Sequence, residues 1–321
     1  MLKRTEFNEN THTDIPSETK GTHEDILNCS VKDDTGLNDF QKLPNENKIA
    51  IPKVGIERFR VPLTFIHEDG GKFNHDVEAS MFVSLAADKT GVNMSRFCKI
   101  LQEESEKTEV SNSFFKTVLR RFRSDLRDYD SEELIPSAEL GLRFKYALKQ
   151  PSLKSNNWGW QYYDCELSGI EDNLGTIEMK LTIAYEYSST CPCSLSMAKQ
   201  YEEDYRNGKT TEGNGIATAH SQRSCAKTQI SYSMDKPISI EELVSILRKA
   251  LPTETQSLVK RQDEQAFAIL NGENPIFVEH VARRLSKTLD SDARILDWNA
   301  HIEHWESLHS HNAVAYIQKI K

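Results

Sequence analysis

The chain has 321 residues, a length that suits two domains of about 150 residues each. Its 40 Lys and Arg residues stand against 49 Asp and Glu, a net charge of −9. That balance weighs against a nucleic-acid-binding protein, because a phosphate-binding surface is usually rich in cations. No apolar run approaches the roughly 18 residues of a membrane-spanning helix, and no secretory signal is expected behind Met1. Six cysteines in a chain of this size do not indicate a disulfide scaffold, so we expect a cytoplasmic protein without membrane or nucleic-acid partners.

The chain opens with a polar stretch, residues 1–48, which holds only two aromatic residues. Such a stretch buries too little apolar surface to offset the entropy of ordering it, so we expect a flexible tail. Beyond it, alternating apolar and polar residues predict strands, and apolar residues at helical spacing predict helices. The first half is expected to run strand, strand, helix, helix, strand, strand, over residues 53–66, 72–86, 93–104, 111–129, 138–149 and 158–168.

The second half repeats this order, with a break inside its helical part at 271–275. The predicted fold class is α+β, with domains at 49–171 and 172–321. Each domain is expected to be an antiparallel four-stranded sheet with two helices on one face. The other face must then be covered, most simply by the other half or by another subunit. The expected strands and helices of the second half lie, in chain order, at residues 176–188, 222–234, 238–251, 253–270, 276–289, 294–303 and 313–319.

The strongest chemical signal is a Cys-Pro-Cys motif at residues 191–193, directly after a predicted strand. Two such cysteines can simply be small buried apolar side chains. A zinc ribbon would need a second closely spaced pair of cysteines, and the chain has none. A metal bound by Cys191 would therefore need ligands from distant parts of the chain.

Candidate ligands occur at three further places. His220 precedes a predicted strand and can equally be a strand-edge residue, while Glu264 lies in a predicted helix and can be a solvated charge. Zinc and similar ions accept thiolate, imidazole and carboxylate ligands together, and an open coordination position would hold an activated water. A cluster beside two Trp residues near the C-terminus is harder to explain without a function. Its members are His304, Glu306, His309 and His311.

Glu279 stands in an otherwise apolar helical turn, residues 275–281. Helical phasing permits an outward-facing charge at this position. A carboxylate can also accept two parallel hydrogen bonds from adjacent N–H donors, and the edge of a guanine ring offers such a pair. The sequence leaves both interpretations open.

Six motifs occur in an order that is similar to a known enzyme family. They lie at residues 51–56, 94–97, 191–194, 220–224, 274–279 and 306–311. Together they resemble the type IB GTP cyclohydrolases, over the chain from about residue 50 to the C-terminus. The resemblance implies two tandem tunnelling-fold domains in each subunit of a homotetramer, with active sites at subunit interfaces.

The same resemblance implies a reaction. It is the conversion of GTP and water to 7,8-dihydroneopterin triphosphate and formate, the first step of folate-type pterin biosynthesis. Archaeal relatives form a cyclic phosphate instead, and the motifs do not distinguish the two products.

The resemblance also assigns metal ligands. Cys191 corresponds to the essential cysteine, with Cys193 as the second choice. The divalent ion would be Zn, Mn or Fe, since these ions share such ligands. The implied ligands are Cys191, His220, Glu264 and His309.

The remaining implied roles concern proton transfer and substrate binding. His309 is expected to transfer protons with Glu306 orienting it, and Glu279 to hold the guanine edge. A triphosphate needs local positive charge in so acidic a chain. The cations expected to bind it are Arg223, Lys260 and Arg261.

One segment departs from the family pattern. Residues 194–219 separate the cysteine motif from His220 by more residues than the family has, and their polar, glycine-containing sequence predicts a surface loop or lid. Two other functions stay open, a metal-independent tunnelling-fold reductase with a nucleophilic Cys and a non-catalytic scaffold stabilised by a metal. The reductase would leave the motifs at His220 and His309 without a role.

Overall fold

A computed structural model describes the protein over residues 29, 31–32, 35–39, 47–127 and 133–320. Most of the predicted tail, 1–48, lies outside the described residues, as does the end of the helix predicted over 111–129.

The chain divides into two compact units. One comprises Met1–Ile51 and Leu85–Val92, and the other comprises Pro52–Ser84 and Asn93–Lys321. The described residues of the first unit include a β-bridge between residues 32 and 38. The second unit holds the helices named below and nearly all of the sheet. A domain boundary between residues 171 and 172 stays a prediction.

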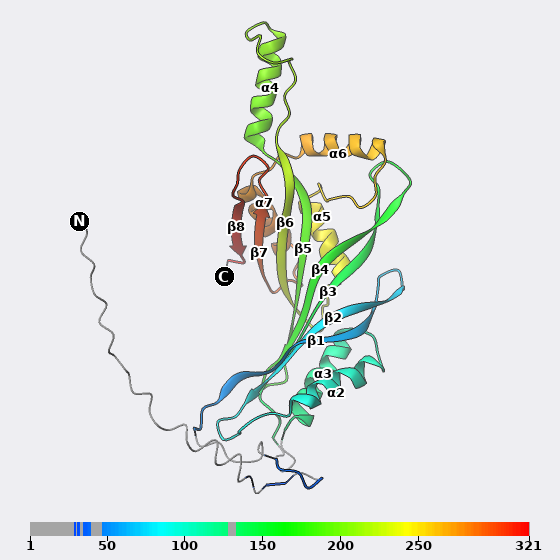
Figure 1. Ribbon diagram of the computed structural model, residues 1–321, viewed down its shortest axis with the longest axis vertical. Coiled ribbons are helices and arrows are strands. Elements are labelled where there is room, and N and C mark those ends of the chain that lie inside the picture. Colours follow the sequence, from blue (N-terminus) through cyan, green and yellow to red (C-terminus); the bar gives the residue numbers. More distant parts are fainter. Residues whose placement is uncertain (1–28, 30, 33–34, 40–46, 128–132, 321) are drawn as a thin grey trace, which may run out of the picture. The chain divides into compact units, whose positions relative to one another are not determined.

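The core of the architecture is one eight-stranded sheet whose strands follow one another in chain order (Figure 1). Every pairing from β2 to β8 is antiparallel. The two expected four-stranded sheets are not separate, because β4 and β5 pair continuously from Asp164 with Ala184 to Glu171 with Ile177. The strands are β1 Ile51–Ile66, β2 Lys72–Leu85, β3 Ala138–Pro151, β4 Trp158–Glu171, β5 Ile177–Thr190, β6 Ser221–Ser233, β7 Asp297–His304 and β8 Ala313–Gln318.

Strand alternation gives the sheet one apolar face and one polar face. Leu181, Ile230 and Trp298 lie side by side across β5, β6 and β7, and none is more than 2% exposed. Helices pack on this apolar face: α3 contacts β3 and β4, α5 contacts β5, and α7 contacts β7 and β8. The helices are α2 Met94–Ser105, α3 Asn112–Asp125, α4 Pro192–Arg206, α5 Ile240–Ala250, α6 Arg261–Glu273 and α7 Val278–Asp290.

None of the helices described combines the length and the hydrophobicity that crossing a membrane requires.

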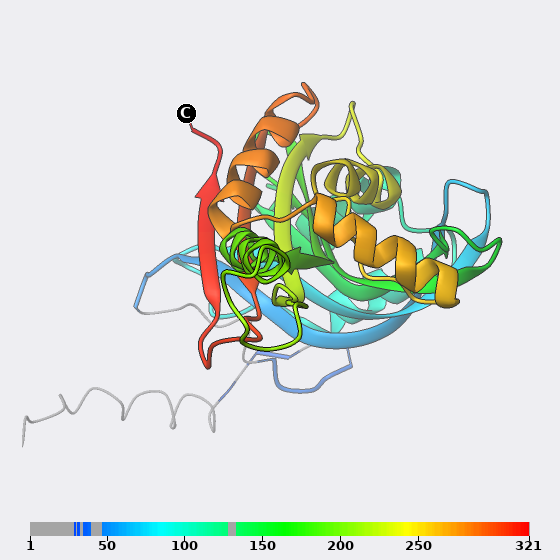
Figure 2. The same ribbon diagram turned by 90° about the horizontal axis from the view of Figure 1, so that it is seen from above.

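The predicted loop or lid at 194–219 is wrong in its first half, which forms most of α4. This helix extends beyond the ends of β5 and β6, and Figure 2 views it nearly end-on. Only Ala198 of α4 is buried, so the helix lacks the apolar stripe from which helices are predicted. Residues 207–220 then return to the start of β6 without helix or strand.

The helix predicted over 253–270 begins only at Arg261. Tertiary contacts hold the preceding segment out of a helix, with a β-bridge between Glu254 and Tyr187. The backbone N–H of Ser188 donates to the carbonyl of Thr253 at 2.7 Å. The buried Glu254 carboxylate accepts hydrogen bonds from Tyr163 Oη at 2.5 Å and from Arg248 Nε at 2.8 Å. A buried carboxylate needs such partners, and they are invisible in a local sequence pattern.

Candidate functional site

Strand pairing brings the cysteine motif to His220. Thr190 and Ser221 are partners at the ends of β5 and β6, so the residues just beyond them are neighbours. The backbone N–H of Cys191 donates to the carbonyl of His220 at 3.2 Å. The backbone N–H of His220 donates in turn to Ser194 Oγ, also at 3.2 Å. Cys191 is the N-cap residue of α4, so the helix starts at this point.

The C-terminal motif contributes a carboxylate to the same place. The backbone N–H of Trp305 donates to the carbonyl of Arg223 at 3.2 Å, which sets the chain after β7 beside the start of β6. Glu306 then lies with its Oε2 3.7 Å from Nδ1 of His220, and both side chains are largely buried. Glu306 therefore faces His220 in this chain. The prediction that it orients His309 has no contact in the structure to support it.

A residue that sequence reasoning missed completes this group. Gln222 places its Oε1 3.1 Å from Nδ1 of His220 and is 8% exposed. The signal was present, since Gln222 stands two residues beyond His220 at the start of a strand. Residues two apart on a strand share one face.

Glu279 approaches the same end of the sheet from α7. The backbone N–H of Ile276 donates to the carbonyl of Thr190 at 3.0 Å, which ties the start of α7 to the end of β5. Glu279 is exposed, and its negative charge acts on His304. Burial lowers the pKa of His304 to about 4, and the charge of Glu279 opposes this shift.

His304 is a further residue whose role the sequence did not show. It is 3% exposed, and its Nε2 lies 2.9 Å from the hydroxyl of Tyr187. A buried, neutral imidazole with one hydrogen-bond partner is a structural group, which separates His304 from the exposed His309 and His311 of the same motif.

The basic side chains that were expected to bind the triphosphate lie in two places. Arg223 is exposed on β6, where its guanidinium lies 5.6 Å from the ring centre of Trp305. Lys260 and Arg261 instead line an open hollow at the start of α6, together with Glu264. The three cations are therefore not gathered into one cluster.

Glu264 and His309 are not brought into a ligand group with Cys191. Glu264 is exposed on α6, and His309 is exposed on the loop after β7, where its ring stacks on His311 at 4.9 Å. Over the part of the chain that the structure describes, no group of three or more His, Cys, Asp or Glu side chains is arranged to hold a metal ion.

The carboxylate beside Glu264 has a structural role instead. Asp263 is fully buried and accepts hydrogen bonds from the backbone N–H groups of Lys154 and Ser155, at 2.7 and 2.8 Å, and from Ser155 Oγ. These bonds hold the pKa of Asp263 well below its usual range, against the opposing effect of burial. Asp263 thereby fixes the start of α6 to the β3–β4 connection and turns Glu264 outward.

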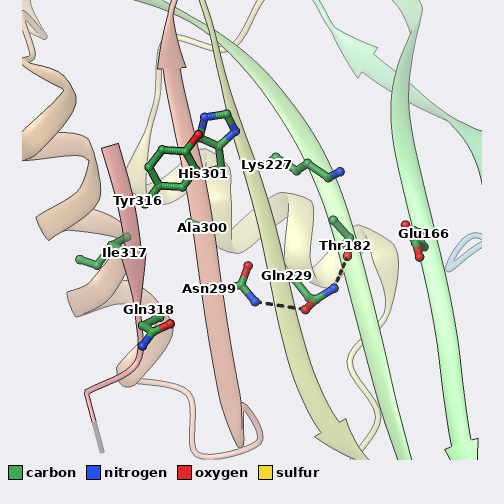
Figure 3. A pocket seen from close by; sticks show the side chains of 10 residues that line it. All are labelled: Glu166, Thr182, Lys227, Gln229, Asn299, Ala300, His301, Tyr316, Ile317 and Gln318. Carbon is green, nitrogen blue, oxygen red and sulfur yellow. Dashed lines mark hydrogen bonds between the residues drawn. The ribbon is translucent and has the colours of Figure 1, made fainter. Parts of the chain in front are cut away.

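A separate hollow lies on the polar face of the sheet (Figure 3). Gln229 Nε2 donates to Thr182 Oγ1 at 3.1 Å, and Asn299 Nδ2 donates to Gln229 Oε1 at the same distance. His301 and Tyr316 stack beside this row, with ring centres 4.4 Å apart. None of the residues that line this hollow belongs to the predicted site.

Comparison with known proteins decides the family. Residues 37–315 match the family described as type I GTP cyclohydrolase folE2. The chain belongs to this family. The match spans almost all of the described residues, and it includes Cys191, His220 and Glu306.

Several relatives carry the family's name. GTP cyclohydrolase FolE2 of Cereibacter sphaeroides (strain ATCC 17029) is 39% identical over 270 residues, which cover 84% of this chain and 70% of that protein. The Roseobacter denitrificans protein of the same name is 39% identical over 288 residues, covering 88% and 74%. The Dinoroseobacter shibae FolE2 is 37% identical over 312 residues, covering 95% and 80%.

Among solved structures, uricase from Arthrobacter globiformis is similar with a TM-score of 0.48 and 8% identity, covering 86% of this chain and 93% of that one. A likeness at this level supports no inference about fold or function.

Proposed function

We propose that this GTP cyclohydrolase converts GTP and water to 7,8-dihydroneopterin triphosphate and formate at a site centred on Cys191 and His220. Family membership supports the activity. The observation that carries the location is a pair of hydrogen bonds at the base of α4, from the Cys191 N–H to the His220 carbonyl and from the His220 N–H to Ser194 Oγ. The first bond joins two of the expected ligands, which stand 29 positions apart in the sequence.

The donors present at this place suit a divalent metal ion such as Zn, Mn or Fe. Cys191 offers a thiolate and His220 an imidazole, a combination that such ions accept. Nδ1 of His220 is directed at Gln222 and Glu306, which leaves Nε2 for a ligand, and metal-binding histidines commonly have their second nitrogen held in this way. When bound, the ion would supply a positive charge that makes water more acidic.

The other two expected ligands, Glu264 and His309, are proposed to come from a neighbouring subunit of a homotetramer. Both are exposed in the single chain, so both are accessible to a partner. An interface site of this kind would assemble only in the oligomer.

The remaining side chains act on the substrate. Opening the imidazole ring of GTP requires water to attack C8 and protons to move to and from the ring. His309 is proposed to carry these protons, because an imidazole can both accept and donate a proton. Glu279 is proposed to accept hydrogen bonds from the guanine edge, a role that its place at the start of α7 near the end of β5 supports.

The triphosphate is proposed to bind Arg223 from one subunit, and Lys260 with Arg261 from another. This division follows from their separation in the single chain. Guanidinium groups suit phosphate oxygens because they donate paired hydrogen bonds.

Formate release from GTP tests the proposal. Cys191→Ala and His309→Ala should each lower turnover by about 100-fold or more. Cys193→Ala is the matched control, because Cys193 belongs to the same motif but is exposed, and its turnover should stay close to that of the wild type. A chelator should abolish turnover while the circular dichroism spectrum is retained. Unchanged turnover in both Cys191→Ala and His309→Ala would remove the site assignment.

A further inference from the structure

Gln222 connects His220 to a buried row of hydroxyl groups. Its Oε1 lies 3.1 Å from His220 Nδ1, and its Nε2 donates to Ser189 Oγ at 2.8 Å. Ser189 Oγ lies 2.8 Å from Ser224 Oγ, and both serines are completely buried. The row crosses from the start of β6 to the end of β5 and back to β6.

Two proton arrangements are compatible with these positions. In the first, His220 Nδ1–H donates to the amide oxygen, the amide N–H donates to Ser189, and Ser189 donates to Ser224. In the second, the amide is turned over, each hydrogen bond runs the other way, and the imidazole proton sits on Nε2. Serine hydroxyls both donate and accept, so the serines alone do not choose between the two.

Glu306 favours the first arrangement without a hydrogen bond to the ring, so the hydrogen bond that fixes Nδ1–H is the one to the Gln222 amide oxygen. Glu306 Oε2 is 3.7 Å from the same Nδ1 of His220, and the two side chains are only 12% and 17% exposed. An ionised carboxylate accepts hydrogen bonds and donates none. Its negative charge therefore favours an N–H at Nδ1 and disfavours a lone pair there, an effect that water screens little at a largely buried site.

We propose that Gln222 is a positioning residue that, together with Glu306, holds His220 in the tautomer with its proton on Nδ1, so that Nε2 presents its lone pair to a ligand. The last step, that this ligand is a metal ion, rests on the proposed function. The tautomer itself rests only on the hydrogen bonds and the charge just described. A neutral imidazole has one donor nitrogen and one acceptor nitrogen, so fixing Nδ1 as the donor fixes Nε2 as the acceptor.

The primary test is nitrogen-15 NMR of the metal-free full chain at pH 8, which reports which ring nitrogen of His220 carries the proton. The wild type should show the proton on Nδ1. Gln222→Met, which keeps the length of the side chain and removes the acceptor, should give a mixture of tautomers. Gln222→Glu, which restores an acceptor, should return the proton to Nδ1.

Gln229→Met is the matched control. Gln229 also lies on β6 and also bridges two polar side chains, but on the polar face of the sheet and away from His220. It should leave the His220 tautomer unchanged. If Gln222→Met does not fold, Glu306→Gln removes the charge that favours Nδ1–H and should also produce a mixture of tautomers.

Zinc titration of the same variants separates this inference from the proposed function. Loss of a residue that orients a ligand typically lowers metal affinity by about 10- to 100-fold, and Gln222→Met should fall in that range. Gln222→Glu and Gln229→Met should bind zinc like the wild type.

Two results would overturn the inference: a wild-type His220 with its proton on Nε2, or a Gln222→Met variant whose tautomer and zinc affinity are both unchanged. A wild type that holds the proton on Nδ1 but binds no zinc would instead overturn the metal site of the proposed function and leave the tautomer in place.

Discussion

At the scale of single residues, His304 links burial to pH-dependent stability. Burial lowers its pKa to about 4 in the folded chain, whereas an unfolded histidine titrates near 6.5. The folded state therefore disfavours the proton that the unfolded state takes up as the pH falls below 6.5. This contribution to stability is fully present above pH 6.5 and is lost between pH 6.5 and about 4. Between pH 7 and pH 5 the loss should be about 2 kcal/mol.

The comparison that isolates this effect uses His304→Gln, which does not titrate but can still bond to Tyr187. Urea unfolding of both chains at pH 7 and pH 5 gives the change in free energy of unfolding. The wild type should lose about 2 kcal/mol more than the variant. Parallel losses in the two chains would show that His304 does not disfavour the proton.

The residue scale also shows where sequence reasoning reaches its limit. The family resemblance implied that Cys191 and His220 share a site, and the pairing of β5 with β6 brings them together because Cys191 follows β5 and His220 precedes β6. The sequence pattern did not show which of the two adjacent carboxylates of α6, Asp263 or Glu264, is buried. Asp263 is buried and bonded to Ser155, a residue 108 positions away. The neighbouring sequence therefore gives no sign that Asp263 is buried and Glu264 is exposed.

At the scale of elements, the packing of α3 on the sheet depends on a glycine. A Cβ at Gly169 would lie 2.8 Å from a ring carbon of Phe115 and 3.1 Å from the sulfur of Met179. Both side chains are fully buried, so they have little room to move. Gly169→Ala should lower the free energy of unfolding by about 1–3 kcal/mol, as overpacking of a core typically does.

Gly141→Ala on the adjacent strand is the control. Its Cβ would meet only the hydroxyl of Ser80 at close range, and that hydroxyl can rotate away. The control should therefore change the free energy of unfolding by less than about 0.5 kcal/mol. Equal losses in chemical denaturation for Gly141→Ala and Gly169→Ala would contradict this account of the α3 contact.

The segment after α4 is held to the helix by two hydrogen bonds of Tyr201, whose hydroxyl lies close to Gly213. Tyr201 Oη donates to the carbonyl of Glu212 at 2.6 Å and accepts from the N–H of Gly215 at 3.1 Å. Gly213 has a φ of 74°, and a Cβ there would collide with the Tyr201 hydroxyl. Gly213→Ala should therefore detach residues 207–219 from α4 and increase their rate of proteolytic cleavage.

A double-mutant cycle separates collision from backbone strain. Gly208→Ala carries the same kind of strain, at φ 70°, but meets no atom within 4 Å, so it should raise cleavage less than Gly213→Ala. Tyr201→Phe removes the colliding oxygen. The logarithm of the cleavage rate should therefore rise less in the combined variant with Gly213→Ala than the sum of its rises in the two single variants. Strict additivity would exclude the collision.

Elements with a clear apolar period could be predicted, and those shaped by tertiary contacts could not. The buried stripe of α3, which includes Phe115 and Leu119, shows in the sequence at helical spacing. In α4 only Ala198 is buried, and in the segment 253–260 the bonds and the β-bridge of Glu254 prevent a helix. The segment 253–260 contradicted the pattern because its conformation depends on partners elsewhere in the chain, and α4 did so because a helix that buries only one residue has no apolar period.

At the scale of the whole molecule, the expected ligands occupy surfaces that a single chain does not bring together. Cys191 and His220 meet at the base of α4, while Glu264 is exposed on α6. Resemblance to the family predicted an assembled site in an oligomer, but the sequence alone could not show which residues each subunit supplies. In the proposed symmetric assembly, every site would take Cys191 from one chain and Glu264 from another.

Mixed oligomers test this assembly directly. Cys191→Ala and Glu264→Gln are each expected to be inactive, and the two chains can be coexpressed with different tags and purified through both. If each site takes these residues from different subunits, about one quarter of the sites in randomly mixed oligomers will be intact. Formate release from GTP should then return to a comparable fraction of the wild-type rate. Mixed oligomers as inactive as either parent would contradict a GTP cyclohydrolase site shared between subunits.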